Sequence, residues 1–568
     1  MKQKLLILAN IIIICLLALS SCDTGTTDPP EPQPPTISLD SETDSYTVRV
    51  NEEIVITPTY ENVSSASFSW TCDGITISTS ASLSFTFDEV GDYYVALKVT
   101  NSDGYAYKEI KISVMESTLP IIQLVGADQT INIAQGVEFS LSPVVTNATD
   151  ASYIWTLNNV EIANTQELTY TISELGSYTL RLTVTNQDGS NYLELALEVM
   201  TQDQLPFSWS FSSTEYNLSS GRSIRLKCWN IENDFGGDYL WSINDNQVQQ
   251  ATVSEYIFDQ TTLGSYTVRV DKYNTSGTVV LSQELTVNVC GVEGTYKRST
   301  SGSANANVVH EFIPGPGQYV NEDYSCSTMA EANAYALSRL DDQKYVSLGA
   351  YGGYIVVGFD HSIQNSGGYD IVIKGNALET SSEPGIVMVM QDENGDGLPN
   401  DTWYELSGSE TVLNSQIKDY AITYYKPSSS RAPVMWTDNI GGAGTIVCNT
   451  YHQQNYYYPG WIEQEQMTFY GTALVSKTYS SSDSYWVNPA FGWGYADNFS
   501  DTDTQIGGDT DTSNNYLKIS NAIDHNGQSI NLDYIDFVKV YTGVNEQADL
   551  LGEISTEVCS ISDYNMIK

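Results

Sequence analysis

Basic residues are scarce in this chain of 568 residues, which carries 24 lysines and arginines against 70 aspartates and glutamates. The formal net charge of −46 at pH 7 repels phosphate backbones and anionic membrane surfaces. The sequence therefore excludes a nucleic-acid-binding protein with a basic groove. Only 17% of the residues are charged, however, and tyrosine occurs 39 times, so the chain is not a disordered polyacid. This composition is typical of β-sheet.

Histidine and cysteine are also few, and their spacing excludes the usual zinc sites. The four histidines lie apart, and no two cysteines are separated by only two residues. Cys228 and Cys290 each fall on a strand-like run of one domain, so we predict that they pair as a disulfide in an oxidising compartment. Four further cysteines receive no predicted partner: Cys72, Cys326, Cys448 and Cys559.

Catalytic signatures are missing as well. The sequence contains no Gly-x-Ser-x-Gly, no His-Glu-x-x-His and no phosphate-binding loop. Carboxylates that could form a catalytic pair are numerous and scattered, so none is singled out. We therefore predict no catalytic residue and favour a protein that is not an enzyme.

Long hydrophobic runs are absent except at the N-terminus. Residues 5–19 are almost wholly apolar and follow Lys2 and Lys4, but a run of this length is shorter than the roughly 20 residues of a membrane span. The following Leu-Ser-Ser-Cys resembles the lipobox of bacterial lipoproteins. The resemblance implies that residues 1–21 are a lipoprotein signal peptide and that Cys22 carries the lipid. An ordinary cleaved signal is the alternative.

Residues 22–35 are rich in proline and threonine, which predicts an extended tether rather than a folded segment. Acidic residues close behind the cysteine resemble surface lipoproteins of the Bacteroides group. This resemblance implies a protein attached to the outer membrane by its lipid alone and facing the cell exterior. Retention on the periplasmic side is the alternative.

A repeat with a period of 85 to 88 residues follows the tether. Its landmarks are a tryptophan and a later glycine, which occur as Trp70 with Gly91, Trp155 with Gly176, and Trp241 with Gly264. After each glycine, apolar and polar residues alternate, which indicates a strand with one face in a core. We expect each tryptophan to fill the centre of a two-sheet sandwich.

The tryptophan, the Gly-x-Tyr strand and an Asn-x-x-Gly turn resemble the PKD family of Ig-like sandwiches. The resemblance implies three PKD-like domains over residues 36–116, 117–200 and 201–290, although the third departs from the turn motif at residues 274–277. PKD-like domains usually act as spacers and sometimes as adhesion modules. We predict spacers here.

Residues 291–568 have a different pattern, with many short strands and one convincing helix over residues 328–340 that we expect Ser327 to cap. Residues 346–373 resemble the opening of jelly-roll domains with a galactose-binding-like fold. The block resembles an uncharacterised family of Bacteroides-type cell surface proteins, which accompany outer-membrane nutrient uptake systems, including corrinoid ones. The predicted fold class is all-β: tandem PKD-like sandwiches, then a larger jelly-roll-like sandwich with one short helix.

Oxygen-bearing side chains recur with calcium-loop spacing in this C-terminal block. They resemble the calcium loops of dockerins and thrombospondin type 3 repeats, with a glycine at the sixth position for the turn. Trp403 replaces the glutamate expected at the twelfth position, so an acidic β-turn is the alternative. The predicted ligands of a structural calcium ion are Asp392, Asn394, Asp396, Leu398, Asn400 and Asp401. A second group of acids is either another ion site or a solvated loop: Asp497, Asp501, Asp503, Asp509 and Asp511.

Aromatic residues crowd the loop-like stretch around residues 436–495. Three consecutive tyrosines in a strand cannot all enter one core, because alternate side chains face opposite ways. Flat aromatic faces bind sugar rings and other planar ligands, although a second core beneath long loops is the alternative. The predicted ligand-binding residues are Trp436, Tyr456, Tyr457, Tyr458, Trp461, Trp486 and Trp493.

The leading hypothesis is a non-catalytic cell-surface lipoprotein whose spacers present a C-terminal domain that binds a nutrient-derived ligand, first of all a glycan. Its expected partners are that glycan or small nutrient and an outer-membrane transporter complex, without nucleic acid. Three alternatives stay open at this point: an accessory corrinoid (vitamin B12) binder, a glycan hydrolase or lyase, and an adhesin.

Overall fold

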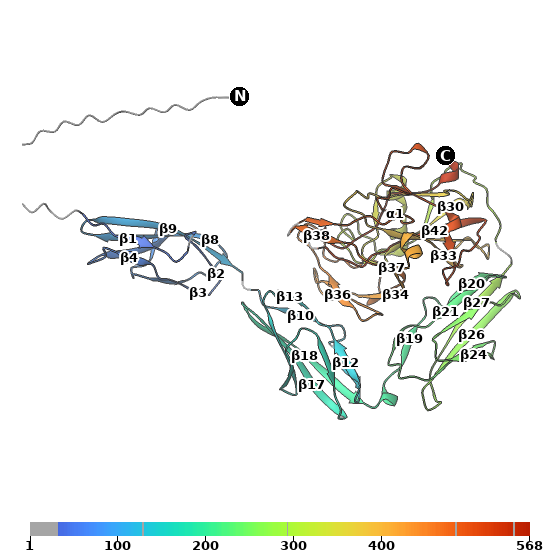
Figure 1. Ribbon diagram of the computed structural model, residues 1–568, viewed down its shortest axis with the longest axis horizontal. Helices are drawn as coiled ribbons and strands as arrows, with labels where there is room; N and C mark the ends of the chain where they lie inside the picture. The colour runs from blue at the N-terminus through green and yellow to red at the C-terminus, as the bar shows by residue number, and fades with distance from the viewer. Residues whose placement is uncertain are drawn as a thin grey trace, which may run out of the picture. The chain divides into compact units, whose positions relative to one another are not determined.

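The computed structural model describes residues 32–567 except 42, 117, 128–129, 292–293, 483–484 and 549–550 (Figure 1). The predicted signal peptide, the lipid site at Cys22 and the tether up to residue 31 lie outside the described residues. The chain divides into two compact units, residues 1–119 and 120–568. Within the described ranges, no helix is long and apolar enough to cross a membrane.

The first unit contains one β-sandwich. Its larger sheet has the order β2-β9-β8-β5-β6, in which β2 runs parallel to β9 and the other pairs are antiparallel. These strands are β2 (Ser45–Arg49), β9 (Gly104–Met115), β8 (Gly91–Asn101), β5 (Ser67–Cys72) and β6 (Ile75–Ser78). The opposing layer consists of two pairs: β1 (Thr36–Ser38) with β4 (Thr59–Glu61), and β3 (Glu53–Ile56) with β7 (Leu83–Thr86).

The same five-stranded order recurs twice in the second unit, as β11-β18-β17-β14-β15 and β20-β27-β26-β23-β24. The first of these sheets has β11 (Ile131–Ala134), β18 (Gly189–Met200), β17 (Gly176–Asn186), β14 (Ser152–Leu157) and β15 (Val160–Ala163). The next has β20 (Glu215–Ser219), β27 (Val279–Cys290), β26 (Gly264–Tyr273), β23 (Tyr239–Ile243) and β24 (Asn246–Ala251). Their opposing layers are the pairs β10 (Ile121–Gln123) with β13 (Val144–Thr146), β12 (Glu138–Leu141) with β16 (Leu168–Thr171), β19 (Ser208–Ser210) with β22 (Trp229–Glu232), and β21 (Ile224–Lys227) with β25 (Glu255–Phe258).

Each repeat tryptophan is buried in its sandwich. Trp70, Trp155 and Trp241 lie on the corresponding strands β5, β14 and β23 and have no exposed surface. The indole of Trp70 donates to the carbonyl of Ser80 at 2.9 Å, and that of Trp155 donates to Thr165 at 3.0 Å. The all-β class and the sandwich repeats are therefore confirmed.

The predicted disulfide between Cys228 and Cys290 is wrong, since both cysteines are free. Cys228 follows β21 and lies near Lys272, which pairs with Leu281 on β27. Cys290 ends β27 nine residues after Leu281, which corresponds to roughly 30 Å along the strand at about 3.3 Å per residue. The two thiols thus lie toward opposite ends of the third sandwich.

The C-terminal domain packs several antiparallel sheets around one apolar core. A six-stranded sheet has the order β28 (Val308–Ile313), β30 (Tyr354–Gln364), β42 (Tyr534–Thr542), β32 (Gly385–Met390), β33 (Trp403–Leu406) and β41 (Ala522–Ile523). A four-stranded sheet has β36 (Ala443–Ile446), β35 (Val434–Asp438), β34 (Gln416–Tyr425) and β37 (Gln466–Leu474). Smaller sheets are β40 (Asn514–Leu517), β31 (Ile371–Lys374) and β44 (Ser560–Asp563); β29 (Val346–Ser347) with β43 (Glu557–Val558); and β38 (Tyr479–Ser482) with β39 (Tyr485–Val487).

The expected helix is α1 (Met329–Asp341), and α2 (Ser409–Leu413) is a second, five-residue helix. The cap of α1 is Thr328 rather than the predicted Ser327, because the Thr328 hydroxyl accepts the backbone N–H of Glu331. The Glu331 carboxylate in turn accepts the N–H of Ser327. The jelly-roll likeness of this domain stays a prediction.

Candidate functional site

A pocket opens between the N-terminal segment of the C-terminal domain, helix α1 and strand β29, and we call it the tyrosine pocket. It is small and opens to solvent, with an interior volume of about 20 Å³, which is room for about one water molecule. Its lining is mostly aromatic: Phe312, Tyr319, Glu322, Asp323, Tyr324, Tyr335, Arg339, Tyr345 and Ser347. Aromatic walls with a few convergent polar groups are typical of small-molecule sites.

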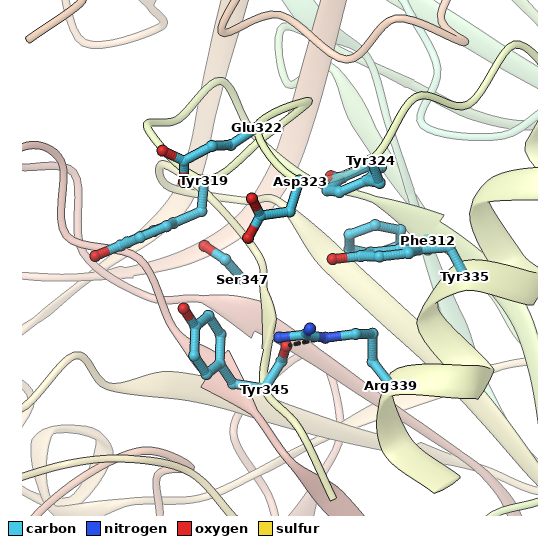
Figure 2. A pocket seen from close by; sticks show the side chains of 9 residues that line it. All are labelled: Phe312, Tyr319, Glu322, Asp323, Tyr324, Tyr335, Arg339, Tyr345 and Ser347. Carbon is cyan, nitrogen blue, oxygen red and sulfur yellow. Dashed lines mark hydrogen bonds between the residues drawn. The ribbon is translucent and has the colours of Figure 1, made fainter. Parts of the chain in front are cut away.

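The rings of the tyrosine pocket form two groups (Figure 2). On one side, Tyr324 and Tyr335 stack with ring centroids 3.9 Å apart and planes inclined by 22°. On the other side, Tyr319 and Tyr345 meet edge to face at 6.1 Å. Figure 2 shows Asp323 between the two groups. Because Tyr345 is 38% exposed, its ring offers a surface to a ligand.

Two charged residues of the tyrosine pocket are held by neighbours. Arg339 donates to the carbonyl of Tyr345 at 3.0 Å, and its guanidinium lies over the ring of the same tyrosine. Glu322 binds Nδ1 of His452 at 2.6 Å, and that imidazole packs edge to face on Tyr319. The shape of the pocket is therefore set before a ligand arrives.

The tyrosines of the pocket stay protonated at physiological pH. Burial raises the pKa of Tyr319 to about 12, and the nearby carboxylate of Glu557 adds to the effect. Burial likewise raises the pKa of Tyr324, Tyr335 and Tyr345. Each hydroxyl can therefore donate a hydrogen bond as well as accept one.

The predicted calcium ligands lie in one turn, residues 392–401, which we call the acidic loop. Asp396 accepts the amides of Asn394 and Asn400, both at 2.9 Å, and the backbone N–H of Leu398. The side chain of Asp392 is buried and bound to Lys297 and Gly397 through one oxygen, and its other oxygen accepts no hydrogen bond from the residues that the structure describes.

The acidic loop also contacts the third sandwich. Asn217 on β20 donates to both the carbonyl and the side-chain oxygen of Asn400. The N–H of Ser219 donates to Glu393. Burial raises the pKa of Glu393 to about 8 and that of Asp401 to about 7. Both residues bear a buried oxygen without a hydrogen bond, as Asp392 does. These orphaned oxygens fit a hard cation, so calcium in this loop stays a prediction that the residues support.

The predicted aromatic binding residues divide by burial. Tyr457, Tyr458 and Trp461 are buried in the core, so they present no open face. Trp461 packs on Phe312 at 5.8 Å and therefore supports the tyrosine pocket from behind. Tyr456 is 43% exposed. Three tryptophans are half-buried on other elements, and their contact with a ligand stays a prediction: Trp436, Trp486 and Trp493.

Sequence reasoning missed the residues that line the tyrosine pocket. Tyr319, Glu322, Asp323 and Tyr324 stand close together just before the cap of α1, and this clustering of rings and acids was the available signal. Tyr335 and Arg339 lie four residues apart on one helix face. The link to β29 could not be seen without the fold.

Comparisons with known proteins bear on the sandwiches. The PKD-like domain family matches residues 34–101 and 120–186. Human polycystin-1 is 23% identical over 277 residues, which cover 48% of this chain, and the chain spans about 6% of the length of that relative.

Solved structures are similar to the chain as well. Sidekick-1 immunoglobulin domains 1–5 match at 12% identity over 45% of this chain and 59% of that chain, with a TM-score of 0.23. The three N-terminal domains of the bacteriophage RB49 outer capsid protein Hoc match at 14% identity over 46% and 100%, with a TM-score of 0.22. The two family matches show PKD-like domains in the N-terminal half of the chain, and such domains suggest a spacer or adhesion role at a cell surface.

Proposed function

We propose that the chain is a non-catalytic cell-surface protein in which PKD-like spacers hold a C-terminal glycan-binding domain. One observation carries this proposal: open tyrosine rings and carboxylates line a single pocket. The apolar face of a sugar ring stacks on an aromatic ring, and its hydroxyls hydrogen-bond to carboxylates and guanidinium groups. Glu322 and Arg339 already hold protein partners, which favours binding over turnover.

The test is titration calorimetry of the full chain against maltohexaose, cellohexaose, xylohexaose and mannohexaose. Tyr345→Ala should weaken binding of the oligosaccharide that the wild type prefers by about tenfold, because one ring-stacking contact contributes up to roughly 1.4 kcal/mol. Tyr107→Ala is the matched control, since it removes a tyrosine that is 57% exposed on the first sandwich. Equal affinity in wild type and Tyr345→Ala would contradict the pocket assignment.

Two further arms separate the alternatives. In the first, the wild type binds cyanocobalamin and none of the oligosaccharides, and Tyr345→Ala weakens that binding. This result would identify a corrinoid binder. Release of shorter sugars during the titration would identify an enzyme instead. Either result would contradict a non-catalytic glycan binder.

Anchoring at the outer membrane is part of the same proposal and rests on the N-terminal sequence. Acylation of Cys22 would hold the chain by buried methylenes at roughly 0.8 kcal/mol each. Cys22→Ala should release the chain from membranes or leave an uncleaved precursor, which cell fractionation would detect. Unchanged membrane retention with normal processing would contradict the lipid site.

A further inference from the structure

Three carboxylates from distant parts of the C-terminal domain converge in its interior, and we call them the carboxylate cluster: Glu383, Asp497 and Glu557. One oxygen from each lies within 4.8 Å of the others. Asp497 has no exposed surface and Glu557 is 2% exposed. A bridge between Gly385 and Ala496 brings the first two segments together.

The position of Asp497 is fixed from several sides. Its two oxygens accept the backbone N–H groups of Asn376 at 2.7 Å and Glu557 at 2.9 Å. Its backbone has φ of 51°, in the left-handed region that non-glycine residues seldom adopt. A Cβ atom at Gly375 would come within 2.3 Å of the Asp497 carboxylate, so only glycine leaves room there. The surrounding structure thus holds this carboxylate in the cluster.

Glu557 points into the carboxylate cluster. Among the described residues, neither of its carboxylate oxygens accepts a hydrogen bond of good geometry, although the hydroxyl of Ser555 and the carboxyl of Glu383 lie close enough to shift its pKa. Burial and the charge of Glu383 raise the pKa of Glu557, and burial and the charge of Asp497 raise that of Glu383 to about 7. A buried anionic group without a partner costs several kcal/mol, so the cluster requires a positive charge or shared protons.

We propose that Glu383, Asp497 and Glu557 together bind one divalent cation, and that this ion is Ca²⁺. An all-oxygen set of carboxylates suits a hard cation rather than zinc or copper. Backbone N–H groups already fix Asp497 as an acceptor, which favours its ionised form over a shared proton. The site is separate from the acidic loop, because none of its residues belongs to residues 392–401.

The ion would stiffen the floor of the tyrosine pocket. Glu557 pairs with Ser347 across β29 and β43, and Ser347 lines the pocket. The hydroxyls of Ser347 and Ser555 bind each other at 2.6 Å, and Ser555 also donates its N–H to Glu383. The metal site is nevertheless independent of the proposed function, because a structural ion needs no glycan.

The experiment counts ions in the full chain. The protein is equilibrated with CaCl₂, freed of unbound ion by gel filtration and analysed by mass spectrometry of the metal. Glu557→Gln should hold one Ca²⁺ fewer than the wild type. Glu557→Gln combined with Asp396→Ala, which disables the acidic loop, should hold one Ca²⁺ fewer than Asp396→Ala alone. Asp370→Asn is the matched control, since Asp370 is fully buried, lies outside the cluster, and accepts a hydrogen bond on each of its carboxylate oxygens. It should keep the wild-type count.

Thermal unfolding of the same samples adds a second measurement, in which the difference in melting temperature between Glu557→Gln and the wild type should change sign with calcium. In chelator, Glu557→Gln should melt above the wild type, because it removes one of three repelling charges. In calcium it should melt below the wild type. If Glu557→Gln does not fold, Glu383→Gln, whose residue is partly exposed, takes its place. An unchanged ion count, or higher melting in both media, would overturn the site and show that the carboxylates share protons.

Discussion

The first sandwich and the C-terminal domain bury different chemistry. The described buried side chains of the first sandwich are all apolar, whereas the C-terminal domain also buries Asp497, Asp503, Glu553 and Glu557. Apolar burial alone stabilises a spacer, so nothing in its core calls for a ligand. Buried carboxylates need protons, donors or cations, and such groups concentrate at functional sites. The contrast supports the proposal that the C-terminal domain binds the ligand.

The third sandwich lies between these extremes. It has its own apolar core around Trp241, yet it also buries Asn217 and Ser219, which contact the acidic loop. Arg225 and Lys227 on β21 form ion pairs with Asp419 of the C-terminal domain. The third sandwich therefore contacts the C-terminal domain directly, through hydrogen bonds and ion pairs.

The largest expected effect concerns the core of a spacer. Trp70→Ala in residues 32–119, a separate compact unit, should lower the free energy of unfolding by about 3–5 kcal/mol, because it leaves a cavity where a fully buried ring was. Urea denaturation measures the change. Tyr107→Ala, an exposed control on β9, should stay within about 0.5 kcal/mol. A loss below about 1 kcal/mol for Trp70→Ala would contradict its central place.

The next effect should appear only in the C-terminal domain. Burial raises the pKa of Glu553 to about 8, so between about pH 4.5 and 8 the folded state holds a proton that the unfolded chain has released. Its unfolding free energy should therefore fall as the pH rises through this window, by up to about 1.4 kcal/mol per pH unit for this group.

Calorimetry of the full chain in chelator at pH 5.5, 7.0 and 8.5 measures this dependence. The transition of the C-terminal domain should move to lower temperature with rising pH. The first sandwich, in which no carboxylate of the described residues is buried, should change less. If the melting temperature of the C-terminal domain rose with pH, the proposed difference between the two regions would be contradicted.

A smaller effect should come from the acidic loop. Calcium should raise the melting temperature of the C-terminal domain through preferential binding to the folded state. Asp392→Ala with Asp396→Ala should remove the share of that rise that the loop supplies. Asp88→Ala with Asp203→Ala removes two exposed acids from the spacers and should leave the response unchanged. An undiminished response in the loop variant would leave this segment an ordinary acidic turn.

The sandwiches could be predicted from the sequence because their signals are local. Strict alternation after Gly91 decides which face is buried, and a tryptophan repeats at a fixed period. The tyrosine pocket could not be predicted, because three separate segments meet there only after folding. The disulfide failed for the same reason: Cys228 and Cys290 share a domain but lie toward opposite ends of it.

Residues 456–461 show another limit of prediction from sequence. The aromatic composition of residues 456–461 predicted ligand-binding rings, yet Tyr457, Tyr458 and Trp461 are buried. Asn321 donates to the carbonyls of Tyr456 and Tyr458, so this segment holds the entry segment that carries Tyr319. Amino-acid type alone did not distinguish a ring that faces a ligand from one that supports it.

The division between spacer and binding domain is tested most directly by measuring the affinity of each compact unit for the preferred oligosaccharide by titration calorimetry. Residues 120–568 should bind within about twofold of the full chain, and residues 32–119 should show no binding. The full chain carrying Tyr345→Ala should bind about tenfold more weakly than the wild type. If residues 32–119 bound the oligosaccharide and residues 120–568 did not, this account would be contradicted and the ligand would be assigned to the PKD-like repeats.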